Sequence, residues 1–112
     1  MSLPFEAQVV KRPDETIVSL RGELDMVTVA YFSQLVDELL ASRRSRLVLD
    51  LSGVTFIDSR GLAAILAAHR SWTDDGRTME IVRGSRAVMR VFEMSGIVEM
   101  LPFINTDGET HS

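Results

Sequence analysis

Two short segments of the sequence carry side chains whose types and spacing could do chemistry. The first is Gly22-Glu23-Leu24-Asp25, and the second runs from Thr55 to Gly61 and contains Asp58 and Ser59. A serine hydroxyl serves either as a nucleophile, if a base is within reach, or as a site of phosphorylation. These two chemistries make different demands on the surrounding sequence.

The sequence gives little support to the hypothesis that Ser59 is a catalytic nucleophile. Ser59 has no G-x-S-x-G frame, and His69 lies ten residues further along the same expected helix, about 15 Å away by helical rise. Gly53 and Gly61 form neither a Walker A motif nor a dinucleotide-binding fingerprint. With no cysteine, and with His69 and His111 outside any H-x-x-x-H or H-x-x-E spacing, we expect no metal and no cofactor.

Two other interpretations of Ser59 stay open on the residues alone. Asp, Ser and Gly are common in turns, and a serine that opens a helix most often serves only as the N-cap. Alternatively, a phosphate on a serine at a helix N-terminus lies where the backbone N–H groups and the helix dipole favour negative charge.

Hydrophobic periodicity predicts the elements that must position these residues. Apolar residues alternate in the first twenty positions, which indicates a hairpin, and the period then changes to 3.6. A continuous apolar run, Leu47–Leu51, is typical of a strand buried on both faces, and Ser52-Gly53 is expected to end it. Arg43-Arg44-Ser45-Arg46 places positive charge after the first helix, where the dipole favours it. The expected strands are 5–10, 16–20, 47–51, 78–82 and 101–104, and the expected helices are 29–41, 59–74 and 86–95, with Ser85 capping the last and Gly96 closing it.

This order predicts an α/β fold. Strands that alternate with helices form a mostly parallel sheet of four or five strands, here with an antiparallel N-terminal hairpin strand and three to four helices. Function in such sheets gathers at the carboxyl ends of the strands. We therefore expect the loop with Asp25 and the loop with Asp58 and Ser59 to lie close together.

Length and composition bound the function further. The 112 residues suit one domain, 1–112, with residues 1–4 and 105–112 expected to fray. The net charge is −4, from 12 basic and 16 acidic side chains without a basic block, so we expect no direct nucleic-acid partner. Neither a signal peptide nor a membrane span is visible, and a cytoplasmic protein is expected.

The motifs themselves carry a resemblance. The stretch Asp50-Leu51-Ser52-Gly53-Val54-Thr55-Phe56-Ile57-Asp58-Ser59-Arg60-Gly61-Leu62 resembles the signature of the STAS-domain family of anti-sigma factor antagonists. Gly22-Glu23-Leu24-Asp25 resembles the second recurring element of that family. The similarity extends from about Phe5 to Ile104, and many relatives have a last helix that is missing or very short here.

The resemblance implies a STAS-like fold and a partner-binding switch rather than an enzyme. Members of the family bind an anti-sigma factor that is also a serine-protein kinase, which frees the sigma factor. The kinase phosphorylates the serine after the Asp of the D-S-x-G element, which ends binding, and a phosphatase resets the cycle. Carried over by position, the phosphorylation site is Ser59, and the implied partner-binding residues are Gly22, Asp25, Asp58, Ser59, Arg60, Gly61 and Leu62. The protein itself is expected to be a monomer or a weak homodimer.

Two points stay open within the resemblance. Many relatives have a small hydroxyl residue after the acceptor serine, where this chain has Arg60, which could pair with Asp58, pair with a phosphate or contact one particular kinase. STAS-like domains also serve as phosphorylation-independent scaffold subunits in stress-signalling or lipid-transport complexes. Incubation with ATP and a cognate kinase separates the switch from the scaffold.

Overall fold

A five-stranded sheet forms the centre of this computed structural model, which describes residues 5–42 and 44–104. The strand order is β1-β2-β3-β4-β5; β1 and β2 pair antiparallel and all other neighbours are parallel. The predicted α/β class is thereby confirmed. The terminal segments 1–4 and 105–112, which were expected to fray, lie outside the described residues. The strands are β1 (Phe5–Lys11), β2 (Glu15–Leu24), β3 (Arg46–Ile57), β4 (Thr78–Val82) and β5 (Phe103–Ile104).

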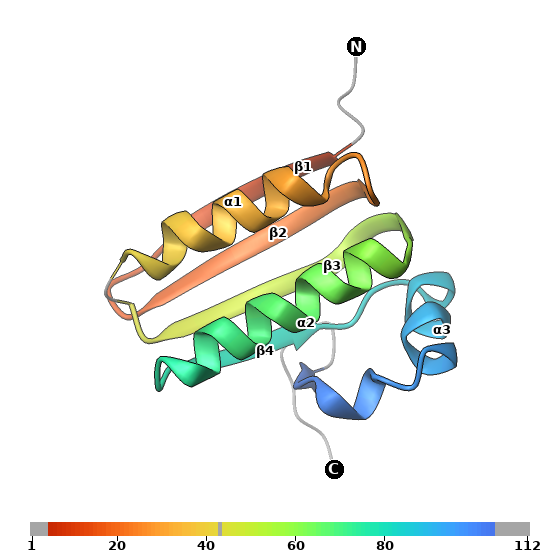
Figure 1. Cartoon of the computed structure of the whole chain (residues 1–112). Helices are drawn as coiled ribbons and strands as arrows, with labels where there is room; N and C mark the ends of the chain where they lie inside the picture. Colours follow the sequence, from red (N-terminus) through yellow and green to blue (C-terminus); the bar gives the residue numbers. More distant parts are fainter. Residues whose placement is uncertain (1–4, 43, 105–112) are drawn as a thin grey trace.

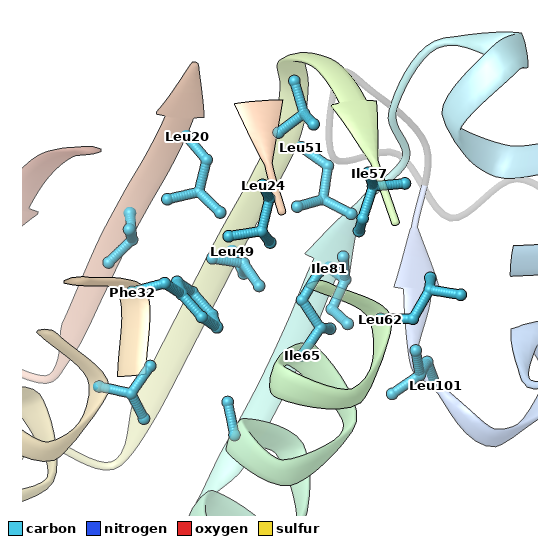
Figure 2. Packing of buried hydrophobic residues seen from close by; sticks show 14 of the residues in the cluster. Leu20, Leu24, Phe32, Leu49, Leu51, Ile57, Leu62, Ile65, Ile81 and Leu101 are labelled. Atoms are coloured by element: carbon cyan, nitrogen blue, oxygen red, sulfur yellow. The ribbon is translucent and has the colours of Figure 1, made fainter. Parts of the chain in front are cut away.

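Helices α1 (Val29–Leu40) and α2 (Ser59–Asp74) lie side by side across one face of the sheet (Figure 1). Helix α3 (Arg86–Met94) stands beside the end of the sheet where β3 leads into α2, and a 3₁₀ turn, η1 (Val98–Met100), follows it. Leucine and isoleucine side chains from the strands point toward the helices and form the core with them (Figure 2). Trp72, near the end of α2, is fully buried.

Strand β3 does not end at Ser52-Gly53, so that prediction is wrong. Its register with β2 slips twice, and each slip gives β3 one extra residue, as a β-bulge does. Buried residues therefore recur at Leu51, Val54 and Ile57, three residues apart instead of two. The bulges keep the core side of β3 apolar through a segment that reads as a turn in the sequence.

Strand β3 is also less enclosed than its apolar run indicates. Val48 and Asp50, the outward residues of that run, are half-buried, because α1 and α2 cover only one face of the sheet. On the other face Arg46 bridges two strands by ion pairs with Glu15 of β2 and Glu80 of β4. Arg46 therefore serves the sheet and not the end of α1.

The carbonyl end of α1 is instead held by a residue far along the chain. The guanidinium of Arg77 donates to Leu40 O at 2.8 Å and also lies 4.8 Å from the centre of the Trp72 ring. This placement puts a positive charge at a helix C-terminus, where the dipole favours it. Helix α3 ends as predicted, because Ile97 N bonds Phe92 O and Gly96 has φ +77°, the geometry of a Schellman motif. Within the described residues, no helix is long and apolar enough to cross a membrane.

Candidate functional site

The two segments singled out in the sequence meet at one edge of the sheet, and Asp58 joins them. Its Oδ1 accepts hydrogen bonds from Arg60 N at 3.0 Å and Gly61 N at 2.9 Å, which caps α2. Its Oδ2 accepts from Met26 N at 3.2 Å, in the segment between β2 and α1. One carboxylate therefore fixes the start of α2 and tethers the neighbouring loop, which confirms the expected proximity.

Both connecting segments are shorter than the sequence indicates. Gly22 and Glu23 lie within β2, which extends to Leu24, because β2 continues to pair with β3. Thr55–Ile57 belongs to β3 in the same way, so Asp58 is the only residue between β3 and α2. Gly22 pairs with Phe5 of β1 and adopts φ +98°, a conformation that favours glycine.

Asp25 is engaged with its own turn. Its Oδ1 accepts from Val27 N at 3.0 Å and from Thr28 N at 3.2 Å, and its backbone N–H donates to Thr28 Oγ1 at 3.1 Å. The Thr28 hydroxyl in turn donates to Glu23 O at 2.7 Å. Asp25 therefore holds the turn that leads into α1, as aspartates in such turns commonly do.

Ser59 is exposed and is the first residue of α2. The N-cap is Asp58, so of the two interpretations of Ser59 left open by the sequence, that of an N-cap is wrong. An aspartate is an equally good cap, and its position between strand and helix has the extended backbone that a cap requires. The hydroxyl of Ser59 is thus not needed to cap the helix and faces the surface.

The first turn of α2 offers a phosphate fewer free N–H donors than its position at a helix N-terminus indicates. The N–H groups of Arg60 and Gly61, expected to favour an anion there, already donate to Asp58. Arg60 is exposed, and among the described residues only its backbone contacts Asp58; its guanidinium forms no ion pair with that carboxylate. A phosphate on Ser59 would therefore add its charge beside an existing carboxylate.

Gly61 allows α2 to begin close against β2. A Cβ atom at this position would lie 2.4 Å from Leu24 O and 2.8 Å from Ile57 Cγ1, closer than real contacts allow. Gly61 and Leu62 are both buried, and Leu62 is 5% exposed within the core (Figure 2). These two predicted site residues therefore position the surface around Ser59 and contribute little area to it.

Exposed apolar side chains, which were not predicted from the sequence, also lie at this edge. Met26 is 64% exposed and Val27 79%, and both lie in the loop between β2 and α1. Phe56, the last but one residue of β3, is 50% exposed. A contiguous exposed apolar patch rimmed by polar residues is typical of a protein–protein contact site. The signal was present in the alternation: Phe56 precedes the buried Ile57, so it points to the opposite side of β3.

Substituting Asp58 separates its two duties. Asp58→Ala leaves three backbone N–H groups without their acceptor and is expected to lower the free energy of unfolding by about 1–2 kcal/mol. Asp58→Asn is expected to keep its amide oxygen on the two capping N–H groups and to turn its N–H₂ toward Met26 N, so the tether is lost at a smaller cost in stability. Amide hydrogen exchange at Met26, with urea unfolding alongside, measures both.

The control is Asp37→Asn on the exposed face of α1, which removes the same charge without touching the site. Exchange at Met26 should be faster in both Asp58 variants and unchanged in the control. Equal exchange at Met26 in Asp58→Asn and in the unaltered protein would show that the contact is not a tether.

Comparisons with known proteins agree with this architecture. A family model described as "Mlab, STAS domain" matches residues 7–102. The chain is 32% identical over 92 residues to the anti-sigma F factor antagonist of Paenibacillus polymyxa, covering 81% of this chain and 79% of that protein. It is also 32% identical over 69 residues to the anti-sigma-F factor antagonist RsfB of Mycobacterium tuberculosis, covering 62% of this chain and 57% of RsfB.

Solved structures show the same fold. An anti-sigma factor antagonist from Mycobacterium paratuberculosis superposes with a TM-score of 0.81 at 28% identity, covering 92% of this chain and 89% of that one. The unphosphorylated form of SpoIIAA, an anti-sigma factor antagonist, superposes with a TM-score of 0.73 at 20% identity, covering 90% and 86% of the two chains. At that identity the second likeness concerns the fold alone.

Proposed function

The chain belongs to the STAS-domain family, and on that premise we propose that it is an anti-sigma factor antagonist switched by phosphorylation of Ser59. In the unphosphorylated form it binds an anti-sigma factor that is also a serine kinase. This binding releases the sigma factor. The kinase then transfers the γ-phosphoryl group of ATP to the Ser59 oxygen, ADP leaves, and the hydroxyl proton passes to solvent or to a kinase base. A phosphatase restores the serine.

The observation that carries the proposal is the exposed Ser59 at a surface with both polar and apolar parts. The hydroxyl starts α2, and Met26, Val27 and Phe56 supply exposed apolar area around the same edge of the sheet. Such a surface suits a partner that contacts apolar side chains and a polar group at the same edge of the sheet.

Charge supports the direction of the switch. A phosphoserine adds up to about two negative charges at pH 7, and they arrive beside Asp58, whose oxygens already use the nearby N–H donors. Like charge against a partner costs several kcal/mol when the interface excludes water. The phosphate therefore ends binding without a large rearrangement of the domain.

The experiment is phosphate transfer from labelled ATP by the kinase encoded with this protein or captured by it. The unaltered protein is expected to take up one phosphate, which tandem mass spectrometry places on Ser59, and to leave the kinase complex as it does so. Ser59→Ala is expected to take up none and to remain bound. Ser71→Ala, an exposed serine further along α2, is the matched control and should be phosphorylated at the normal rate.

Two outcomes would contradict the proposal. Phosphate on another residue would move the switch away from Ser59. Stable binding to the partner with no phosphate uptake would favour a phosphorylation-independent scaffold, which is the alternative that the family resemblance leaves open.

A further inference from the structure

A second surface lies at the same edge of the sheet, between β4 and α3. Arg83, Arg86 and Arg90 line a hollow of about 470 Å³ together with Gly84, Met89 and Glu93, and we name it the arginine hollow. Helix α3 follows β4 just as α2 follows β3, and β3 and β4 are parallel neighbours. Strand β4 ends at Val82, opposite Asp50, whereas β3 continues to Ile57, so the two strand ends are offset along the sheet. Figure 1 shows α3 beside the start of α2, where Ser59 lies.

The arginines of this hollow have no carboxylate partner within residues 5–42 and 44–104. The ion pairs described there belong to Arg46 and Arg77. Arg83 lies over the Phe103 ring at 5.6 Å, a contact that fixes its side chain without neutralising its charge. Arg86 and Arg90 are exposed and, four residues apart, share one side of α3. Glu93 is the one acidic residue of the hollow.

This grouping of charge is unfavourable for the domain alone. Arg86 is the first residue of α3, where the helix dipole disfavours a cation, and the first turn has no acidic residue. Arg86 and Arg90 also repel each other at i, i+4. The protein has a net charge of −4, yet residues 83–90 hold three arginines and no acidic residue. A locally unfavourable choice of this kind is expected at a functional surface.

We propose that the arginine hollow receives an acidic segment of the partner protein that also covers Ser59. This inference rests on the proposed function and adds the chemistry of the partner: a run of aspartate or glutamate carboxylates. Arginine suits this occupant because its planar guanidinium binds carboxylates through two hydrogen bonds. The same acidic segment would be attracted by the arginines and repelled by a phosphate on Ser59, so the two surfaces act together in one switch.

The test uses a glutamate octapeptide as the acidic probe, titrated into the full-length protein and followed by the backbone and arginine side-chain NMR signals. Signals of the arginine hollow are expected to shift, and a lysine octapeptide should leave them in place. The double variant Arg86→Ala/Arg90→Ala is expected to raise the dissociation constant roughly tenfold, since two exposed ion pairs are lost. Arg12→Ala/Arg70→Ala removes two other exposed arginines and should change it less than about twofold.

Three outcomes would overturn the inference. The control double variant could weaken the peptide as much as the hollow variant does, which would reduce the effect to overall charge. Inorganic phosphate could shift the same signals at lower concentration than the octapeptide, which would make the hollow a small-oxyanion site. Asp107→Asn/Glu109→Gln could raise the affinity for the octapeptide tenfold, which would identify the chain's own C-terminal segment as the occupant. All titrations are run on Ser59→Ala as well, so the result does not depend on phosphorylation, and a failure here is distinct from a failure of the kinase experiment.

Discussion

Replacing Gly61 by alanine is expected to lower the free energy of unfolding by about 3 kcal/mol, the upper end of what overpacking costs. The new Cβ would lie 2.4 Å from Leu24 O, which is backbone and has no rotamer to escape into. Relief requires α2 to move away from the end of β2, which pulls on the Asp58 tether to Met26. Urea unfolding followed by the fluorescence of Trp72, buried at the far end of α2, measures the loss.

The control for this substitution is Gly96→Ala, after α3. Gly96 has a positive φ but no atom near its would-be Cβ, so alanine there meets backbone strain alone, about 1 kcal/mol. The difference between the two variants isolates the steric contact beneath α2. If Gly61→Ala lowered the free energy of unfolding no more than Gly96→Ala does, the start of α2 would accommodate a Cβ atom, which contradicts the close approach to Leu24 O.

Replacing Ser59 by glutamate is expected to weaken binding to the anti-sigma partner by at least about a hundredfold, equivalent to about 2.7 kcal/mol. Residue 59 follows Asp58 in the chain, and under the proposed function the new carboxylate would lie on the surface that the partner covers. The variant should fold normally, because a negative charge in the first turn of a helix is favourable. Titration calorimetry with the purified partner measures the dissociation constants.

Ser59→Gln is the matched control, since glutamine has the shape of glutamate without its charge. It should bind within about tenfold of the unaltered protein, and Ser59→Ala should bind equally well. A glutamine variant as weak as the glutamate variant would mean that size at this position ends binding and that charge does not.

The sequence predicts the order of elements well because each helix and strand carries its own period. Ser85 at the start of α3 and Gly96 after its end both follow local rules, and the structure confirms them. The continuation of β3 through Ser52-Gly53 does not follow from local rules. It depends on pairing with β2, whose partner residues are about 30 positions away, and on bulges that only the paired strands define.

The location of the site could be predicted from the sequence, but the hydrogen bonds within it could not. The proximity of the two segments follows from parallel strands sharing an edge, and Asp58 and Ser59 were found by their motif. Which of the two caps α2 could not be predicted, because aspartate and serine are both good N-caps. Only the backbone conformation at the start of the helix decides between them. The role of Arg77 at the end of α1 was equally hidden, since its partner Leu40 is 37 residues away.

A single residue, Asp58, connects β3 to α2. Its side chain accepts hydrogen bonds from Met26 N before α1 and from Gly61 N in α2, so the connection is held on both sides. Ser59 is thus presented by the tertiary fold and not by an extended stretch of sequence. Under the proposed switch, a misfolded or truncated chain offers the kinase no proper substrate. Phosphorylation of this serine would then depend on folding, so only folded domains would be phosphorylated.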